Sequence, residues 1–363
     1  MTATTADQLF LRAATELAEQ GRMTCAPNPP VGCVIVRGGQ IIGRGFHAQA
    51  GHGHAEVNAR DDAGGDISEA TVYVSLEPCA FEGRTPACAN MLIEAQVARV
   101  VIAANDPHPQ VAGAGVSLMR AAGIEVELLP DPLADELITG YVSRIMRQRP
   151  FVRIKTGSSL DGATALASGQ SQWITSLAAR ADVQYWRARA DAIITGVGTV
   201  LADDPQLNVR DPRYDQCKQP LRVILDTDLQ TPPAAKVLTD GGPTLVVHGR
   251  DATDAHQLSR APNVSTLALD QGPADLASVL SYLAQQGCNE VLVEAGARVC
   301  GSFAEQSLWD EWLCYVAPKW LGSQTRPLAE FKVMDLAQAP VGLVKSIERV
   351  GDDCRIRVQR EAL

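Results

Sequence analysis

The sequence has no lysine before position 155, so the fixed positive charges of its first 154 residues are all arginines. Acidic residues outnumber these arginines, and the whole chain of 363 residues carries a formal net charge of −10. A chain without a broad basic face lacks the electrostatic footprint of nucleic-acid binding. We therefore expect no nucleic-acid partner, although one or two local cations suffice for a small phosphorylated substrate.

Three further absences narrow the class of protein. No apolar run approaches the length of a membrane span, and residues 1–7 lack the basic and apolar regions of a signal peptide. The nine cysteines are an odd number and scattered, which is not a disulfide framework and indicates a reducing compartment. With 46% hydrophobic residues, the chain reads as a cytoplasmic globular protein without a membrane partner, long enough for two domains.

The stretch from Ala50 to Cys88 carries the strongest chemical signal. His54-Ala55-Glu56 is followed by Pro78-Cys79 and, after eight more residues, by Cys88. Imidazole and thiolate groups suit a tetrahedral zinc ion, and a catalytic zinc site keeps one position for water. His54, Cys79 and Cys88 are therefore the expected ligands of one zinc ion per chain. Glu56 is the expected general acid/base, which takes a proton from the activated water and passes it on.

Other interpretations of this stretch stay open. A structural zinc site needs a fourth protein ligand, for which His52 is available, although it is more typical of an exposed loop residue. Two cysteines nine positions apart can also be unrelated core thiols. We favour the catalytic interpretation because three ligands, Glu56 and Pro78 occur in the order of the zinc-deaminase signature, despite its usual two-residue cysteine gap.

Strands and helices alternate through the first half. We expect a helix capped by Asp7, with the apolar residues Leu9, Phe10, Ala13 and Leu17 on one shared face and Gly21 at its end. Expected strands cover 31–36, 40–45, 71–76, 99–104 and 124–128, and expected helices cover 55–63, 113–122 and 133–146, with another starting near Pro86. This order predicts an α/β domain with a mixed sheet covered on both faces. Pro150 marks the boundary, so the predicted domains are 1–147 and 150–363.

The first half resembles the cytidine-deaminase-like zinc deaminases, and the chain as a whole resembles the bifunctional deaminase/reductases of riboflavin biosynthesis. The matching stretches are Pro27-Asn28-Pro29-Pro30-Val31-Gly32, Gly45-Phe46-His47, His54-Ala55-Glu56-Val57, Glu77-Pro78-Cys79 and Gly83-Arg84-Thr85-Pro86 with Cys88. The resemblance implies hydrolysis of the 2-amino group of 2,5-diamino-6-ribosylamino-4(3H)-pyrimidinone 5′-phosphate. It also implies that Asn28, His47 and Arg84 line the substrate site. The chain departs from the family at Phe81, where a histidine is common.

The second half also reads as an α/β domain. Expected strands lie at 151–156, 221–226, 244–248, 290–294, 311–317 and 354–358, with another from Asp191 that ends in a glycine loop, 196–199; expected helices cover 177–189 and 275–286, with a further helix ending at Gln306. The loop at 196–199 and the strand-to-helix junction at 296–299 are candidate anion-binding loops. Neither fits the G-x-G-x-x-G fingerprint, so the pattern alone does not define a dinucleotide.

The resemblance extends through this half in Ser159-Leu160-Asp161-Gly162, Ser171-Gln172-Trp173-Ile174-Thr175 and Asp203-Asp204-Pro205. It implies a dihydrofolate-reductase-like α/β domain that uses NADPH to reduce the ribosyl group to ribityl, giving 5-amino-6-(5-phospho-ribitylamino)uracil. Lys155 is the implied catalytic residue. The implied NADPH positions are Gly157, Trp173, Thr199, Asp203, Thr227 and the run Gly296, Ala297, Arg298, Val299, Cys300, Gly301 and Ser302. The implied substrate positions are Ser171, Arg187, Leu207, Arg210 and Glu294.

Two competing hypotheses remain. The chain can be a deaminase of free or nucleic-acid bases with an appended binding domain, but the long cysteine gap and the lack of a basic patch oppose this. The second half can instead be a regulatory nucleotide-binding module without chemistry, which an assay of NADPH oxidation would exclude. The bifunctional enzyme, acting on a small phosphorylated pyrimidine as a homo-oligomer, either dimer or tetramer, is the interpretation that we carry forward.

Overall fold

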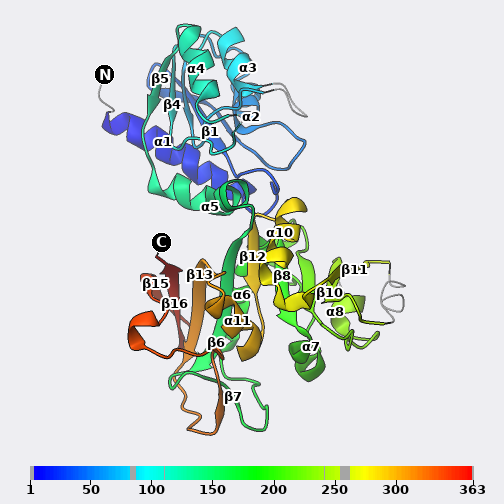
Figure 1. Cartoon of the computed structure of the whole chain (residues 1–363). Helices are drawn as coiled ribbons and strands as arrows, with labels where there is room; N and C mark the ends of the chain where they lie inside the picture. Colours follow the sequence, from blue (N-terminus) through cyan, green and yellow to red (C-terminus); the bar gives the residue numbers. More distant parts are fainter. Residues whose placement is uncertain (1–3, 82–86, 110, 241, 254–261, 362–363) are drawn as a thin grey trace. The chain divides into compact units, whose positions relative to one another are not determined.

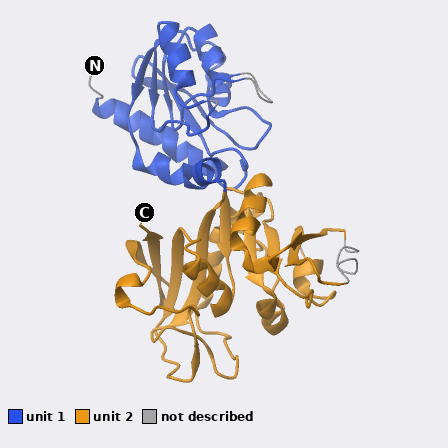
Figure 2. Ribbon diagram, in the orientation of Figure 1, with its two compact units in different colours: residues 1–148 blue, residues 149–363 orange. Residues whose placement is uncertain are grey.

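The chain forms two compact units, Met1–Gln148 and Arg149–Leu363 (Figure 2). The computed structural model describes all residues except 1–3, 82–86, 110, 241, 254–261 and 362–363 (Figure 1). No helix in these described ranges combines the length and apolar character needed to cross a bilayer.

A five-stranded mixed sheet forms the centre of the first unit. Its strand order is β2-β1-β3-β4-β5, from β1 (Gly32–Arg37), β2 (Gln40–Phe46), β3 (Thr71–Val74), β4 (Arg99–Ile102) and β5 (Glu125–Leu128). β1 runs antiparallel to both β2 and β3, whereas β3, β4 and β5 run parallel. The predicted mixed sheet is therefore confirmed. Its parallel strands all end at one edge, where the loops carrying Cys79 and Asp106 begin.

Helices cover both faces of this sheet. They are α1 (Thr5–Ala18), α2 (Ala55–Asp62), α3 (Cys88–Glu94), α4 (Ala114–Ala121) and α5 (Pro132–Arg147). One apolar core packs the sheet against α1 and α5, and a second packs it against α2, α3 and α4. The αβα layering expected from the sequence is confirmed (Figure 1).

The prediction for α1 was wrong in detail. Thr4, not Asp7, is the N-cap, and Asp7 completes a capping box as the third helical residue. The buried face includes Leu11, Ala14 and Ala18. Phe10, Ala13 and Leu17 pack against the same core, as expected, whereas Leu9 is 66% exposed. Asp7 is buried because it accepts hydrogen bonds from the Tyr73 hydroxyl and the Arg99 guanidinium, both at 2.7 Å. A charged residue therefore fixes the orientation of this helix on the sheet.

Two glycines let backbone segments meet beside the expected metal ligands. A Cβ on Gly45 of β2 would lie 2.3 Å from the Ala59 nitrogen, so α2 packs directly on that strand. A Cβ on Gly115 of α4 would lie 2.1 Å from the carbonyl oxygen of Pro78. Any larger side chain would push these helices away. The close packing fixes the first turn of α2 and the loop that ends at Cys79.

The second unit is built on a nine-stranded sheet of order β11-β10-β9-β8-β12-β6-β13-β16-β15. These strands are β6 (Phe151–Ser159), β8 (Ala192–Gly196), β9 (Leu221–Leu225), β10 (Thr244–Gly249), β11 (Val264–Leu269), β12 (Glu290–Val293), β13 (Glu311–Ala317), β15 (Gly342–Val350) and β16 (Asp353–Arg360). The seven strands from β11 to β13 run parallel, and β16 and β15 add an antiparallel edge. β7 (Ala163–Leu166) and β14 (Thr325–Pro327) form a separate ribbon.

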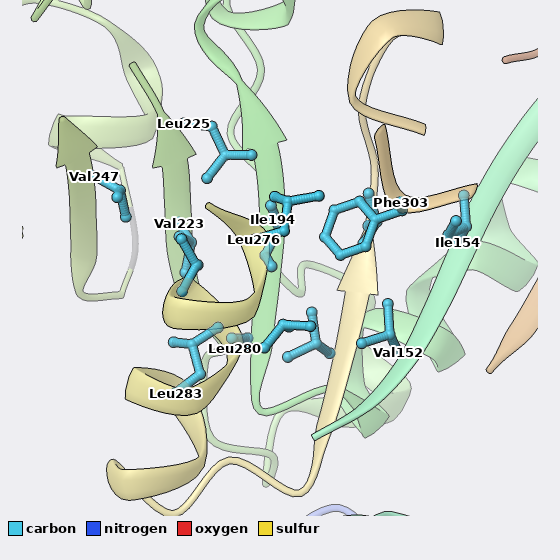
Figure 3. Close-up of a cluster of buried hydrophobic side chains, with 14 of the residues drawn as sticks. Val152, Ile154, Ile194, Val223, Leu225, Val247, Leu276, Leu280, Leu283 and Phe303 are labelled. Carbon is cyan, nitrogen blue, oxygen red and sulfur yellow. The ribbon is translucent and has the colours of Figure 1, made fainter. Parts of the chain in front are cut away.

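Helices also cover both faces of this second sheet, and they are α6 (Leu177–Arg189), α7 (Val197–Asp203), α8 (Lys236–Thr239), α10 (Leu276–Gln285) and α11 (Ala297–Glu305). One core sets α10 and α11 against the sheet, with Leu276, Leu280 and Phe303 against strand residues such as Ile194 (Figure 3). The opposite core contains residues of α6, α7 and α8. The expected α/β architecture of the second half is confirmed.

Two local predictions differ from the structure. Residues 197–199 form the first turn of α7, so the sequence Gly-Val-Gly-Thr at 196–199 is a strand-to-helix junction and not a loop. The strands β7, β11, β14 and β15 were not predicted. The burial pattern of β15 explains its omission, because this edge strand has no buried residue and exposes apolar side chains that do not alternate clearly with polar ones.

Candidate active sites

Three elements of the first unit bring the expected zinc ligands together. His54 is the N-cap of α2, Cys79 follows the end of β3, and Cys88 opens α3. Their ligand atoms all lie within 4.8 Å of one another. His54 Nδ1 is 3.6 Å from Cys79 Sγ and 3.3 Å from Cys88 Sγ. Donor atoms around tetrahedral zinc are about 3.5–3.8 Å apart, so this set fits the ion without a large movement.

The two thiols need a cation before both can ionise. A hydrogen bond from Cys88 lowers the pKa of Cys79, and the same bond together with burial raises the pKa of Cys88. The thiolate of Cys79 is therefore stable beside His54. Its negative charge disfavours ionisation of Cys88. A divalent cation removes this opposition because it attracts both thiolates. The backbone N–H of Cys88 also donates to Cys79 Sγ at 3.3 Å, which further favours a charged sulfur.

Glu56 lies in the first turn of α2, beside the three ligands. Its side chain is buried with 3% exposure, and its carboxyl faces the thiol of Cys88. Burial raises the pKa of Glu56, and the charge of Cys79 adds to this effect while His54 opposes it. A carboxyl group with a raised pKa can both accept and return a proton near neutral pH. His52 is exposed, so the structure offers no support for it as a fourth ligand.

A pocket of about 400 Å³ opens onto these groups. Its walls include Asn28 and His47, the two predicted substrate residues of the deaminase that the structure describes. The Nδ1 atom of His47 is 3.1 Å from the carbonyl oxygen of Gly53, so Nδ1 carries the proton and Nε2 accepts from the Asn28 amide at 3.0 Å. Burial lowers the pKa of His47 and favours this neutral form. Arg84 and Pro86 lie outside the described residues.

In the second unit, predicted site residues gather at the carboxyl edge of the parallel strands. Lys155 follows the part of β6 that pairs with β12, and Glu294 follows β12 itself. Gly196 ends β8, Thr227 follows β9, and Gly249 ends β10, where its N–H donates to the Thr227 carbonyl at 3.1 Å. Ligands of open α/β sheets bind outside this edge.

A cluster of charges forms the centre of that edge. Arg187 of α6 donates to both carboxylate oxygens of Glu294, at 2.6 and 3.0 Å, and to the Asn208 carbonyl at 3.1 Å. Burial lowers the pKa of Lys155, although the neighbouring charge of Glu294 opposes this. Arg210 joins the same cluster, since the charges of Arg187 and Glu294 act on it. Four predicted residues thus share one cluster of charges at this edge.

The junction between β12 and α11 fits a phosphate group. Gly296 is the N-cap of α11 and has no side-chain cap, so the first N–H groups of the helix lack that partner. A Cβ built on Gly296 would lie 4.0 Å from the Thr199 hydroxyl, which places the two predicted NADPH positions side by side. Helix N-termini bind anions through such N–H groups and the helix dipole. The run from Gly296 to Ser302 forms this junction and the following turns of α11.

The remaining predicted residues flank this edge. Ser171 and Trp173 precede α6, and Trp173 is not a core residue, because it is 62% exposed with Arg180 4.1 Å above its ring. Gly157 lies next to Lys155, since a Cβ there would be 3.9 Å from Lys155 Nζ. Asp203 ends α7 and is exposed, and Leu207 is buried with a positive φ of 51°.

Family models match both units. The model of the cytidine and deoxycytidylate deaminase zinc-binding region matches residues 4–104, and that of the RibD C-terminal domain matches residues 150–348. The riboflavin biosynthesis protein RibD of Escherichia coli K12 is 41% identical over 359 residues, which cover 96% of this chain and 97% of that protein. RibD of Haemophilus influenzae is 40% identical over 363 residues, covering 96% of each chain.

Solved structures agree over nearly the whole length. Acinetobacter baumannii RibD, form 1, is 42% identical with a TM-score of 0.92, and the match covers 98% of this chain and 99% of that one. A diaminohydroxyphosphoribosylaminopyrimidine deaminase/5-amino-6-(5-phosphoribosylamino)uracil reductase from Thermotoga maritima is 32% identical with a TM-score of 0.88, at the same coverage.

The chain belongs to the RibD family. It is therefore a bifunctional enzyme of riboflavin biosynthesis, with a zinc-dependent deaminase unit and an NADPH-dependent reductase unit. The family resemblance inferred from the motifs, and the two cofactors that it implied, are confirmed. The base deaminase with an appended binding domain and the regulatory module without chemistry are both set aside.

Several residues of the deaminase pocket were missed by reasoning from the sequence. Glu77 accepts hydrogen bonds from the N–H groups of Gly113 and Val116 at the start of α4. Asp106 accepts from the Tyr141 hydroxyl at 3.1 Å, and burial raises its pKa. Glu77 stands in the stretch Glu77-Pro78-Cys79 that matches the family, which was a usable signal. Tyr141 was hidden in the amphipathic pattern of α5.

Proposed function

We propose that His54, Cys79 and Cys88 hold the zinc ion, and that Glu56 moves the protons of deamination. The substrate is 2,5-diamino-6-ribosylamino-4(3H)-pyrimidinone 5′-phosphate, which loses its 2-amino group as ammonia. One observation carries the proposal: three ligand atoms within 4.8 Å of one another meet at a pocket that Glu56 also lines. Zinc supplies Lewis acidity that makes hydroxide available from water at neutral pH.

The protein residues have separate roles in this step. Glu56 accepts one proton of the attacking water and passes it to a ring nitrogen. It then moves the proton of the newly formed hydroxyl to the amine, which leaves as ammonia while the carbonyl forms, so Glu56 ends in the protonation state in which it began. Asn28 and His47 form a wall beside the ligands, and their fixed hydrogen bond orients the amide toward the pyrimidine. Arg84 is proposed as a cation for the substrate phosphate, as the family match implies. Phe81 contributes an apolar ring, which stacks on His108 with centroids 5.8 Å apart.

For the reductase, we propose that Lys155 polarises the sugar of the deaminated intermediate while C1′ is reduced. NADPH supplies the hydride, and the product carries a ribityl chain. The charge cluster supports this role, because the charges of Glu294 and Arg187 both act on Lys155, and these two side chains form a largely buried ion pair. Arg210, Ser171 and Leu207 complete the proposed substrate contacts. The proposed NADPH contacts are Gly157, Trp173, Thr199, Asp203, Thr227 and the run from Gly296 to Ser302.

We further propose that the deaminase comprises residues 1–147 and the reductase residues 150–363, that the enzyme works in the cytoplasm, and that it is a homo-oligomer. Support for assembly comes from β15, the last strand of the large sheet, which exposes Leu343, Val344 and Ile347 by 55%, 59% and 64%. Exposed apolar edge strands favour association. Light scattering should therefore give a molar mass of two or four chains.

The direct test of the proposed function is one preparation assayed three ways. Metal analysis should give one zinc ion per chain, the diaminopyrimidinone should release ammonia, and the deaminated compound should oxidise NADPH. Zinc at one per chain without ammonia release would contradict the deaminase assignment, and absence of NADPH oxidation would contradict the reductase assignment.

A further inference from the structure

Arg144 gives the deaminase pocket a fixed positive charge. It is the only arginine or lysine among the described residues that line the pocket. It stands in the last turn of α5, with its guanidinium 5.6 Å from the centre of the Tyr141 ring. One of its Nη2 protons is donated to the Pro27 carbonyl at 2.9 Å. The side chain is therefore held at the pocket wall and does not extend freely into solvent.

A continuous row of contacts leads from Arg144 to the metal ligands. Arg144 bonds the Pro27 carbonyl, and the next residue, Asn28, donates to His47. The His47 ring in turn packs edge-on against the His54 ring, with centroids 5.1 Å apart. Arg144 thus lies at one end of a row of contacting residues, and the proposed zinc ligand His54 lies at the other end. A nucleotide-like substrate with its base at zinc would direct its sugar phosphate along this wall.

The acidic side chains of the pocket oppose a phosphorylated substrate, and Arg144 offsets them. Glu56, Glu77 and Asp106 all line the pocket. Glu77 is neutralised in part by N–H groups of α4, and Asp106 by the Tyr141 hydroxyl and the His108 N–H. These partners are neutral, so among the described lining residues Arg144 alone brings a fixed positive charge against the repulsion of a phosphate dianion. A guanidinium matches phosphate both in charge and in the spacing of its donors.

We propose that Arg144 binds the 5′-phosphate of the deaminase substrate and thereby selects phosphorylated pyrimidines over the free nucleosides. This inference rests on the proposed deaminase function and adds a specificity-determining residue to it. Arg144 acts on binding, because it touches the phosphate and lies apart from the groups that move protons.

The test compares two compounds, the phosphorylated substrate and the same compound after phosphatase treatment. Loss of a charge-assisted hydrogen bond should raise the KM of Arg144→Ala for the phosphorylated substrate by about 10- to 100-fold. Its KM for the dephosphorylated compound should match that of the wild type. Arg144→Lys keeps the charge and loses the planar fork, so its KM should be intermediate. Ribose 5-phosphate should compete with substrate in the wild type and compete much more weakly in Arg144→Ala.

Arg147→Ala is the matched control, because Arg147 is exposed in the same turn of α5 and does not line the pocket. It should behave as the wild type with both compounds. An unchanged KM in Arg144→Ala, an equal loss with both compounds, or a loss of zinc would overturn the inference, since the last two results mean that Arg144 only supports the wall. If the wild-type enzyme itself, with zinc bound, releases no ammonia from either compound, the proposed function fails instead.

Discussion

Replacing Arg187 by alanine should destabilise the reductase unit strongly. The guanidinium donates two hydrogen bonds to Glu294 and one to the Asn208 carbonyl, and the side chains of Arg187 and Glu294 are only 11% and 10% exposed. Arg187→Ala removes all three bonds and leaves the carboxylate of Glu294 in a buried site. The destabilisation therefore comes from an uncompensated charge more than from the lost bonds themselves.

The expected magnitude follows from the remaining partners of Glu294. Breaking a buried ion pair by removing one partner costs about 3–5 kcal/mol. Lys155 and Arg210 still face Glu294 in the variant, so we expect about 2–3 kcal/mol. For a unit of this size, each kcal/mol lowers Tm by about 2–4 °C, which predicts a fall of about 5–10 °C. Arg213→Ala, which breaks an exposed ion pair with Asp211, should leave Tm almost unchanged.

The effect should depend on pH in a defined direction. Burial tends to raise the pKa of Glu294, but Arg187, Lys155 and Arg210 hold it below its usual range. In the wild type, the ionised carboxylate thus stabilises the fold above the unfolded pKa of about 4.3, and this stability is lost as pH falls. Without Arg187, fewer positive charges offset the effect of burial, so the pKa of Glu294 rises. The stability gap between wild type and variant should therefore be widest near pH 7 and narrow toward pH 4.

Tryptophan fluorescence gives a selective assay. All five tryptophans, the first being Trp173, lie in the second unit, so their thermal transition reports the reductase and not the deaminase. The double variant Arg187→Met with Glu294→Gln removes both charges and should melt above Arg187→Ala. Equal Tm values for wild type and Arg187→Ala, or a gap that widens as pH falls, would refute this reasoning.

Two further predictions concern single functional groups. Lys155→Ala should slow reduction of the deaminated substrate about 10- to 100-fold, because it removes a charged hydrogen-bond donor. Ammonia release by the deaminase should stay normal. An unchanged rate of NADPH oxidation would show that Lys155 is not part of the reductase site. Cys79→Ser should lose zinc, because a hydroxyl is a much weaker zinc ligand than a thiolate. Metal analysis after dialysis against a chelator measures this loss. Retention of one zinc ion per chain would show that the remaining ligands suffice.

Much of the first site could be predicted because its chemistry is concentrated in short motifs. Each functional group lies at a helix start or after a strand end, and local sequence patterns predict such positions. These groups are the proposed zinc ligands His54, Cys79 and Cys88 and the carboxylate of Glu56. The pocket walls could not be found in this way. Arg144 belongs to an amphipathic helix, where an arginine in the last turn is ordinary. Only tertiary packing shows that it faces the pocket.

The errors in the fold have a similar origin. Leu9 was placed on the apolar face of α1 because it is hydrophobic, yet it is exposed. Asp7 is buried because Tyr73 and Arg99 of the sheet donate hydrogen bonds to it. The second site was inferred largely from family resemblance, since Arg187 and Glu294 are 107 positions apart and no local pattern links them. Parallel strands bring such distant residues to one edge, which a sequence pattern does not reveal.

The measurement that tests the account most directly is the pair of turnovers of Glu56→Gln together with its zinc content. Glutamine keeps the volume of Glu56 and removes its basic oxygen, so the fold and the three ligands should survive. Deamination should fall by about 10²–10⁴-fold, the contribution of a positioned general acid/base, while zinc stays near one per chain and reduction of already deaminated substrate is normal. Deamination at the native rate by this variant would contradict the central claim.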